Sequence, residues 1–293
     1  MRPAADHPGM PGTRLFLMTA AAMLAFAGNS LLCRMALATT QIDPASFTLV
    51  RIVAGAVTLY VLVQVRRGTA PVGGNWMSAL ALFGYAAGFS FAYVSLSAGT
   101  GALLLFGAVQ ATMIGYGLFQ GERLGAWQVM GVCLAVAGLI GLLLPGVQAP
   151  PLGGSLLMLG AGVAWGIYSL RGRGISQPTE ETAGNFIRAV PMAIVVSGLW
   201  LSHAELDTAG IWYAAASGAM ASGLGYAIWY SVLPRLAATT AATVQLSVPA
   251  IAAITGVILL SEPITVRLLL ASAAILGGIA VFILVRPGSA PAD

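Results

Sequence analysis

Long uninterrupted runs of apolar residues alternate with short polar breaks along nearly the whole chain of 293 residues. Each run is long enough for a helix of about 20 residues, the length that crosses a lipid bilayer. The runs are continuously apolar, which favours helices over the alternating strands of a membrane barrel. They fall at 14–33, 46–65, 76–97, 101–120, 126–144, 153–171, 183–202, 210–231, 239–260 and 266–285. The pattern predicts an all-α integral membrane protein with ten transmembrane helices.

Turn-forming residues separate the apolar runs, because proline, glycine and asparagine favour the backbone angles of turns. The breaks are Asp43-Pro44, Gly73-Gly74-Asn75, Gly99-Thr100-Gly101, Pro150-Pro151, Gln177-Pro178 and Glu262-Pro263. The loops are too short to hold a soluble domain. The first run is similar to a signal peptide around Ala25-Phe26-Ala27, but it continues to Leu32. We therefore interpret it as an uncleaved first span.

The second half of the chain repeats the first. The matching pairs are Arg34 and Arg171, Arg51 and Arg188, and Tyr93 and Tyr230 at an offset of 137, then Glu122 and Glu262, and Gly138 and Gly278 at an offset of 140. Five spans per unit force the second copy to insert upside down, and inverted repeats are typical of transporters that open to either side in turn. The predicted organisation is a tail at 1–13, a first repeat at 14–146, a second repeat at 152–286 and a tail at 287–293.

The charge distribution indicates how the helices are oriented. The mean hydropathy is +0.90 and 8% of the residues are charged, whereas a soluble chain has about 25%. With the N-terminus in the cytoplasm, Arg2, Arg14, Arg66, Arg67, Arg123, Arg171, Arg173, Arg235 and Arg286 lie inside, and Arg34 and Arg267 lie outside. Because positive side chains gather on the cytoplasmic side, we expect both termini in the cytoplasm.

Several other classes of protein are disfavoured. The net charge of +4 comes from arginines at the ends of apolar runs, which argues against nucleic-acid binding. The two cysteines, Cys33 and Cys133, lie in apolar stretches without the neighbours of a disulfide or metal site. No HExxH motif, paired aspartates or Ser/His pair at membrane depth suggests an enzyme, and no filter-like loop suggests a channel. We expect no cofactor, a small-molecule substrate, membrane lipid as the other partner, and a monomer or weak dimer.

Five short motifs resemble one known family. They are Gly225-Tyr226 with Trp229-Tyr230, Val244-Gln245-Leu246-Ser247-Val248-Pro249, Ser261-Glu262-Pro263-Ile264, Ala164-Trp165-Gly166 and Glu122-Arg123-Leu124. The chain resembles the ten-helix, EamA-type members of the drug/metabolite transporter superfamily. It departs from them at Gly28-Asn29, where the family usually has Trp-Gly, and at Val109, where it usually has proline. Within the family, the resemblance is to bacterial exporters of amino acids, including the aromatic-amino-acid exporter, and it implies the bacterial inner membrane as the location.

Acidic residues are missing from the middle of every predicted span. Proton antiporters usually need an intramembrane carboxylate or histidine that binds proton and substrate in turn. The sequence therefore favours facilitated transport, or coupling through a group at a span end.

Four charged residues near span ends have structural interpretations. We expect Glu122 and Glu262 to cap the N-terminus of the helix that follows each of them. Arg51 and Arg188 lie about six residues inside their spans, and we expect them to reach the headgroups or to form structural hydrogen bonds. The sharper alternative is that one of them binds the carboxylate of a zwitterionic substrate.

Polar and aromatic residues deep in the spans are the candidates for a substrate pocket, because a buried amide must find partners. Aromatic rings could hold an ammonium group by cation–π contact and an apolar side chain by packing. The candidates are Asn29, Tyr85, Phe89, Tyr93, Gln110, Trp165, Tyr168, Tyr226, Trp229, Tyr230, Gln245 and Ser247. For each one alone, packing between helices is an equally good interpretation.

Two prolines within spans are candidate hinges. Pro191 and Pro249 each free a backbone carbonyl and bend a helix, and their first-half counterparts, Ala54 and Val109, are not proline.

The expected function is export of amino acids, neutral or aromatic, or similar metabolites by alternating access. The alternative is another substrate class: a nucleoside, a nucleotide-sugar or a cationic drug.

Overall fold

The computed structural model describes residues 11–68, 72–146, 148–236 and 238–284, and within them it contains helices and no strand. The helices are α1 Gly12–Thr39, α2 Pro44–Arg67, α3 Trp76–Tyr93, α4 Ala98–Phe119, α5 Ala126–Leu143, α6 Leu152–Arg171, α7 Pro178–Leu199, α8 Thr208–Ala216, α9 Gly225–Val232, α10 Ala238–Gln245, α11 Ser247–Leu260 and α12 Val266–Leu284. Among the described residues, eight helical stretches are long and apolar enough to cross a membrane, and one of them, Thr240–Leu260, joins α10 and α11. The prediction of an all-α, multi-pass membrane protein is confirmed. Arg2, Arg286 and most of both predicted tails lie outside the described residues.

Several helices begin at a residue whose side chain caps them. The Asp43 carboxylate accepts hydrogen bonds from the backbone N–H groups of Ala45 and Ser46 at 2.9 and 3.0 Å, and Pro44 is the first residue of α2. Asn75 caps α3 in the same way, through the N–H of Ser78. Since the first N–H groups of a helix have no partner within it, these residues fix the starting points.

One predicted break is wrong. Gly99-Thr100-Gly101 forms the first turn of α4 rather than a loop, and the chain turns before it, at 94–96, with Ser97 as the capping residue. A Cβ atom on Gly99 would lie 2.7 Å from the Cβ of Ala253. The glycine therefore allows α4 to approach α11 closely, which is a packing role and not a turn.

The eighth and ninth predicted spans are irregular helices. α8 continues without a break into a π-helical segment, η2 Ser217–Leu224, and then into α9. Such π segments are rare and frequently lie at functional sites. α10 and α11 are separated by Leu246 alone, close to Pro249.

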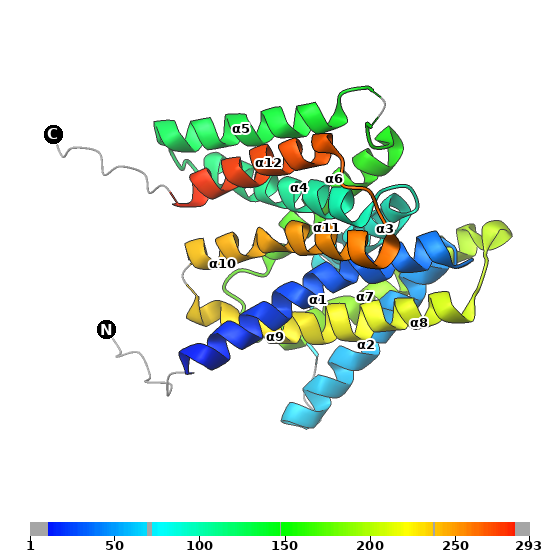
Figure 1. Cartoon of the computed structure of the whole chain (residues 1–293). Helices are drawn as coiled ribbons and strands as arrows, with labels where there is room; N and C mark the ends of the chain where they lie inside the picture. Colours follow the sequence, from blue (N-terminus) through cyan, green and yellow to red (C-terminus); the bar gives the residue numbers. More distant parts are fainter. Residues whose placement is uncertain (1–10, 69–71, 147, 237, 285–293) are drawn as a thin grey trace, which may run out of the picture.

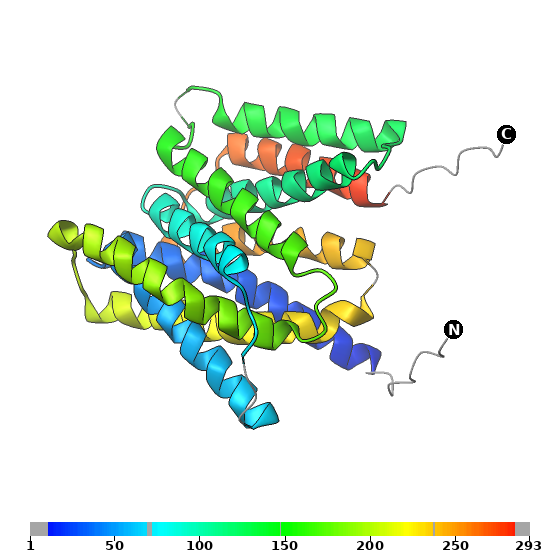
Figure 2. The ribbon, with the colours of Figure 1, turned by 180° about the vertical axis from the view of Figure 1, so that it is seen from behind.

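Helices from the two halves of the chain pack against one another. α5 packs on α12, α2 on α7 and α4 on α11, so three helices contact their own repeat counterparts. α3 packs on α6, and α1 packs on α8, η2 and α9. α5 and α12 lie side by side along one edge of the bundle in both views, and α2 crosses the opposite edge (Figures 1 and 2). The start of α1 and the end of α12 lie at the same end of the bundle (Figure 1). We call this the proximal end and the opposite one the distal end.

Glycines bring α5 and α12 into backbone contact. A Cβ atom on Gly131 would lie 3.0 Å from the backbone nitrogen of Phe282 and closer still to the carbonyl oxygen of Gly278. Backbone atoms cannot move aside as a flexible side chain can. Small residues at this contact are therefore a requirement of the helix pair.

We expect Gly131→Leu to destabilise the protein by about 1–3 kcal/mol or more, because the added side chain overpacks a backbone contact. The measurement is the melting temperature of the purified protein in detergent. Gly141→Leu on the same helix is the matched control, since a Cβ atom there meets nothing within 4 Å. Equal melting temperatures for the two variants would contradict the close packing of α5 and α12.

Candidate functional site

A cavity of about 450 Å³ extends from the middle of the bundle to its proximal end. At depth it is bounded by Phe26 of α1, Gln110 of α4 and Trp165 of α6. Its other end is bounded by Arg173 and Leu236, which follow α6 and α9 at the proximal end. The volume is within the range of small-molecule sites.

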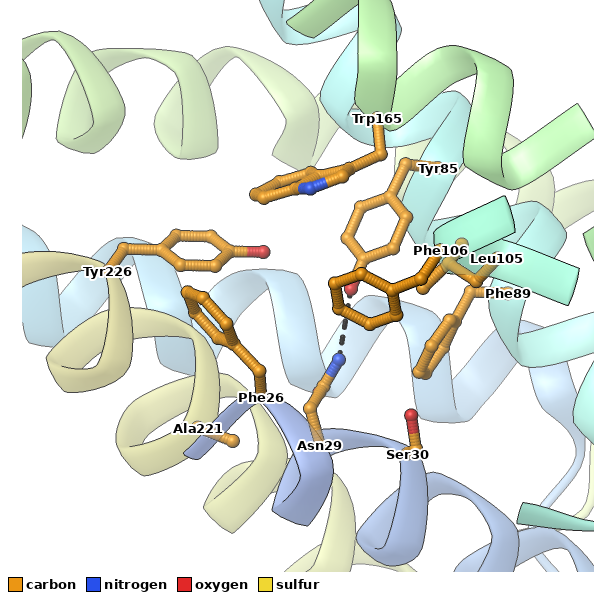
Figure 3. A pocket seen from close by; sticks show the side chains of 10 residues that line it. All are labelled: Phe26, Asn29, Ser30, Tyr85, Phe89, Leu105, Phe106, Trp165, Ala221 and Tyr226. Carbon is orange, nitrogen blue, oxygen red and sulfur yellow. Dashed lines mark hydrogen bonds between the residues drawn. The ribbon is translucent and has the colours of Figure 1, made fainter. Parts of the chain in front are cut away.

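A second, much smaller chamber lies beyond the cavity (Figure 3). Its volume is about 20 Å³, enough for a water molecule but not for a metabolite. Phe26, Trp165 and Tyr226 line both spaces. The Trp165 and Tyr226 rings stack with centroids 5.1 Å apart, and Phe26 meets Tyr226 edge-on at 5.9 Å. These three rings form an aromatic partition between the cavity and the chamber.

A chain of hydrogen bonds crosses the chamber between four helical segments. Ser217 Oγ, in the π segment, donates to Asn29 Oδ1 at 2.6 Å. Asn29 Nδ2 donates to the Tyr85 hydroxyl at 3.0 Å, and Arg51 Nη2 donates to the same hydroxyl at 2.9 Å. The network supplies hydrogen-bond partners for the Asn29 amide and holds the Tyr85 ring in place. Without it, buried polar atoms would be left unpaired.

Arg51 is fully inside the bundle, with 1% of its surface exposed. Its guanidinium carbon lies 4.8 Å from the centroid of the Phe89 ring and 5.1 Å from that of Tyr85. The expectation that Arg51 reaches the headgroups is therefore wrong. Its Nη1 atom is buried and has no hydrogen-bond partner within the described part of the chain.

The structure separates the sequence candidates into groups. Asn29, Tyr85, Phe89, Trp165 and Tyr226 line the chamber, and Gln110, Trp165, Tyr226, Trp229, Tyr230 and Gln245 line the cavity. Tyr168 stacks on Trp165 but turns its hydroxyl away from the chamber, to Thr182 and Asn185 at 3.4 Å each. Ser247 donates to a carbonyl of its own helical run and lines neither space. Tyr93 is buried and donates to the Ala98 carbonyl.

Sequence reasoning missed several lining residues. Phe26, Ser30, Leu105, Phe106 and Ala221 complete the chamber. Phe26 and Phe106 could have been found, because each is an aromatic residue inside a predicted span. Leu105 and Ala221 have no such signal, since nothing in an apolar run distinguishes a cavity wall from a surface that faces lipid.

The second-half counterpart of Arg51 has a different environment. Arg188 Nη1 donates to the carbonyl oxygens of Gly73 and Gly184, at 2.7 and 3.0 Å. It ties the segment before α3 to α7. Pro191 lies inside α7, and Pro249 lies in the first turn of α11, near the break at Leu246.

Glu262 closes the distal end of the bundle. Its carboxylate accepts from Arg34 Nε at 2.9 Å and from the backbone N–H of Ala98 at 2.8 Å. Arg34 Nη1 also donates to the carbonyl oxygens of Tyr93 and Val94 at the end of α3. We call Arg34, Glu262 and the start of α4 the distal lock. Glu262 thus caps α4, in the other half of the chain, and not the following helix as the sequence predicted.

Glu122 is arranged differently, although it is the repeat counterpart of Glu262. It is exposed, and its carboxylate folds back over Gly117 of the helix before it. In the described ranges it makes no side-chain hydrogen bond or ion pair, and α5 is capped instead by Gln128, which accepts from the Gly125 N–H at 3.0 Å. Arg171, the counterpart of Arg34, donates to Ser78 and Asn75. The predicted capping by Glu122 is therefore wrong.

A bundle of helices long and apolar enough to span a membrane, with a cavity that reaches one end and an ion pair at the other, is typical of a transporter of small molecules. Residues 152–284 match the model of the EamA-like transporter family. The Uncharacterized protein PA1977 of Pseudomonas aeruginosa is 56% identical over 282 residues, which cover 96% of this chain and 98% of that protein. The chain belongs to the EamA-like transporter family, within the drug/metabolite transporter superfamily, and is therefore not an enzyme.

Other relatives are more distant. The Threonine/homoserine exporter RhtA of Escherichia coli (strain K12) is 35% identical over 153 residues, half of each chain. The Uncharacterized transporter YoaV of Bacillus subtilis (strain 168) is 24% identical over 257 residues, covering 82% of this chain and 87% of that protein. A crystal structure with a TM-score of 0.67 and 20% identity covers 92% of this chain and 97% of its own, so the fold is a known one.

Proposed function

We propose that the protein exports amino acids or similar small metabolites across the bacterial inner membrane by alternating access. The observation that carries this proposal is the difference between the two ends of the bundle. The distal end is closed by an ion pair, whereas the cavity reaches the proximal end. In the transport cycle this is the state open to the cytoplasm.

We further propose ten membrane spans with both termini in the cytoplasm. Eight helices qualify by length and composition. The other two are α3 and the continuous run α8–η2–α9, from Thr208 to Val232. Ten crossings agree with the position of the start of α1 and the end of α12 at one end of the bundle. The proximal end is then cytoplasmic, and the repeats are 14–146 and 152–286.

The repeat supplies the second state. The counterparts of Arg34, Glu262 and the start of α4 are Arg171, Glu122 and the start of α10, at offsets of 137 or 140. We call these three the proximal lock. Among the described residues, Glu122 makes no ion pair with Arg171, whose guanidinium donates to Ser78 and Asn75 instead. When the distal lock opens, the inverted halves exchange conformations and the proximal lock forms.

The contacts between helices support this exchange. Three helices pack on their own counterparts, as expected for elements near a pseudo-two-fold axis in the membrane plane. The pairs α3–α6 and α1–α8/α9 are related by the same exchange of halves. Each lock joins a helix of one half to a glutamate of the other, so breaking one and forming the other moves both halves together.

The hinge role of Pro249 stays a prediction. The adjacent break at Leu246 and the missing proline at Val109 suggest that the second half bends more than the first. We expect Pro249→Ala to slow transport several-fold. Alanine restores a backbone N–H that can donate a hydrogen bond within the helix, and this bond stiffens the continuous segment α10–α11. Initial transport rates in liposomes measure this, and an unchanged rate would contradict the hinge.

The substrate proposal rests on the site and on one relative. The cavity offers amide groups at Gln110 and Gln245 together with aromatic walls, which suits a polar solute with an apolar side chain. RhtA, named as an exporter of threonine and homoserine, is similar over half the chain. Another class of metabolite or drug is the alternative. The described spans contain no carboxylate near their middle that could bind a cationic drug. This favours an amino acid over a cationic drug as the substrate.

The test is counterflow of labelled solutes by the purified protein in liposomes. The panel contains threonine, leucine, phenylalanine, glutamate, a nucleoside, a nucleotide-sugar and a quaternary ammonium cation. We expect neutral amino acids to exchange and the other classes not to. Movement of another class without any amino acid would overturn the substrate proposal. Running the assay with and without a pH gradient tests facilitated transport.

A further inference from the structure

Arg51 carries a positive charge that the described part of the protein does not neutralise. The ion pair between Arg34 and Glu262 lies at the distal end and does not involve Arg51. Within the bundle, Arg51 has the Tyr85 hydroxyl and two aromatic rings as neighbours, and its Nη1 atom has no partner. Taking an ion out of water is expensive, and cation–π contacts offset only part of that penalty.

The donors around Tyr85 are arranged for an acceptor better than a phenol. Asn29 Nδ2 and Arg51 Nη2 converge on one neutral oxygen, at 3.0 and 2.9 Å. The spare Nη1 belongs to the same guanidinium. A carboxylate has two oxygens and a full negative charge, and it matches the planar fork of an arginine. It could accept from Arg51 twice and from Asn29 once.

We propose that Arg51 is the specificity-determining residue of the transport site, and that it binds a single carboxylate of the substrate together with Asn29. The carboxylate replaces the Tyr85 hydroxyl as the acceptor, and the Tyr85 ring moves aside. The remainder of the substrate lies towards the aromatic partition of Phe26, Trp165 and Tyr226, where rings suit an ammonium group or an apolar side chain. This inference rests on the proposed export of small metabolites and specifies their charge: zwitterions and monocarboxylates.

The repeat gives a matched comparison. Arg188 occupies the corresponding position, but its guanidinium donates to two backbone carbonyls and it is only partly buried. It holds two segments together, which is a structural role. Arg51 lies beside the chamber and has a donor left over. The two arginines should therefore respond differently to the same substitution.

The first test compares phenylalanine with phenylalaninamide, which lacks the carboxylate, in liposomes. For the wild type we expect counterflow of the acid to exceed that of the amide at least about tenfold. Arg51→Gln should remove this preference, because it slows the acid more than the amide, and Arg51→Lys should retain part of it. Arg188→Gln should slow both solutes alike. Equal slowing of acid and amide by Arg51→Gln would overturn the inference.

The second test does not depend on the identity of the substrate. We expect the ligand-free melting temperature of Arg51→Met in detergent to equal or exceed that of the wild type, because the variant removes an uncompensated buried charge. Arg188→Met should melt lower. A drop of several degrees for Arg51→Met would show that Arg51 is a structural residue and overturn the inference. If the wild type carries no member of the panel, the proposed substrate fails, and this measurement still decides the role of Arg51.

Discussion

Replacing Glu262 by glutamine is expected to open the distal end and to slow transport at least about tenfold. The carboxylate accepts from Arg34 at 2.9 Å and from the Ala98 N–H at 2.8 Å, and the two side chains are only 20% and 12% exposed. Hydrogen bonds to a charged group are worth about 1.5–3 kcal/mol each. Since 1.4 kcal/mol is a factor of ten, losing them should shift the protein strongly towards the state open to the outside.

The measurement uses one reporter cysteine, Ser30→Cys, on the wall of the chamber. Cys33 and Cys133 are first replaced by alanine, and a membrane-impermeant maleimide is added to intact cells. Labelling should be slow with Glu262 and at least about tenfold faster with Glu262→Gln. Glu205→Gln is the control, because Glu205 is an exposed acid at the same end. Unchanged labelling and transport in Glu262→Gln would mean that the ion pair does not hold this end closed.

Replacing Glu122 by glutamine is expected to slow transport to a similar extent, but by the opposite shift. In the present state the Glu122 carboxylate is exposed, and no partner for it is found in the described ranges, so the melting temperature should not change. The loss should arise in the outward-open state, where Glu122 meets Arg171 and the start of α10. Labelling of the Ser30→Cys reporter from outside should fall below that of the parent protein.

A combined variant sharpens this second prediction. Glu122→Gln with Glu262→Gln weakens both states, so labelling should return towards the parent value while transport stays slow. Arg123→Gln is the control, since it changes an exposed neighbouring charge. Transport at the normal rate in Glu122→Gln would refute the proximal lock, while the distal lock and the family membership would stand.

The two locks illustrate what symmetry in the sequence can and cannot convey. The matching of Glu122 with Glu262 and of Arg34 with Arg171 is visible in the sequence. Which glutamate meets which arginine is not, because the partners lie 228 residues apart, in opposite halves. Local reasoning therefore assigned each glutamate to the next helix along the chain. The structure assigns Glu262 to α4 and leaves Glu122 exposed.

The arginines give a second example. Arg51 and Arg188 have the same place in their repeats, and the sequence suggested headgroup contact or hydrogen bonding for both. Burial differs because α2 turns Arg51 towards Tyr85 and Phe89, whereas the glycine-rich segment before α3 offers its carbonyls to Arg188. Neither environment can be read from the sequence near the arginine.

The sequence by itself determined the class of the protein. Three features of the sequence carried this information: the continuous apolar runs, the residues that cap helix N-termini, such as Asp43-Pro44, and the repeated arginines. They depend on local chemistry and on the requirements of the bilayer, which apply to every segment independently. The tertiary structure alone decided the cavity, the aromatic partition, the distal lock and the burial of Arg51. These features join residues from different spans, and an apolar helix can present the same sequence to lipid, to another helix or to a cavity.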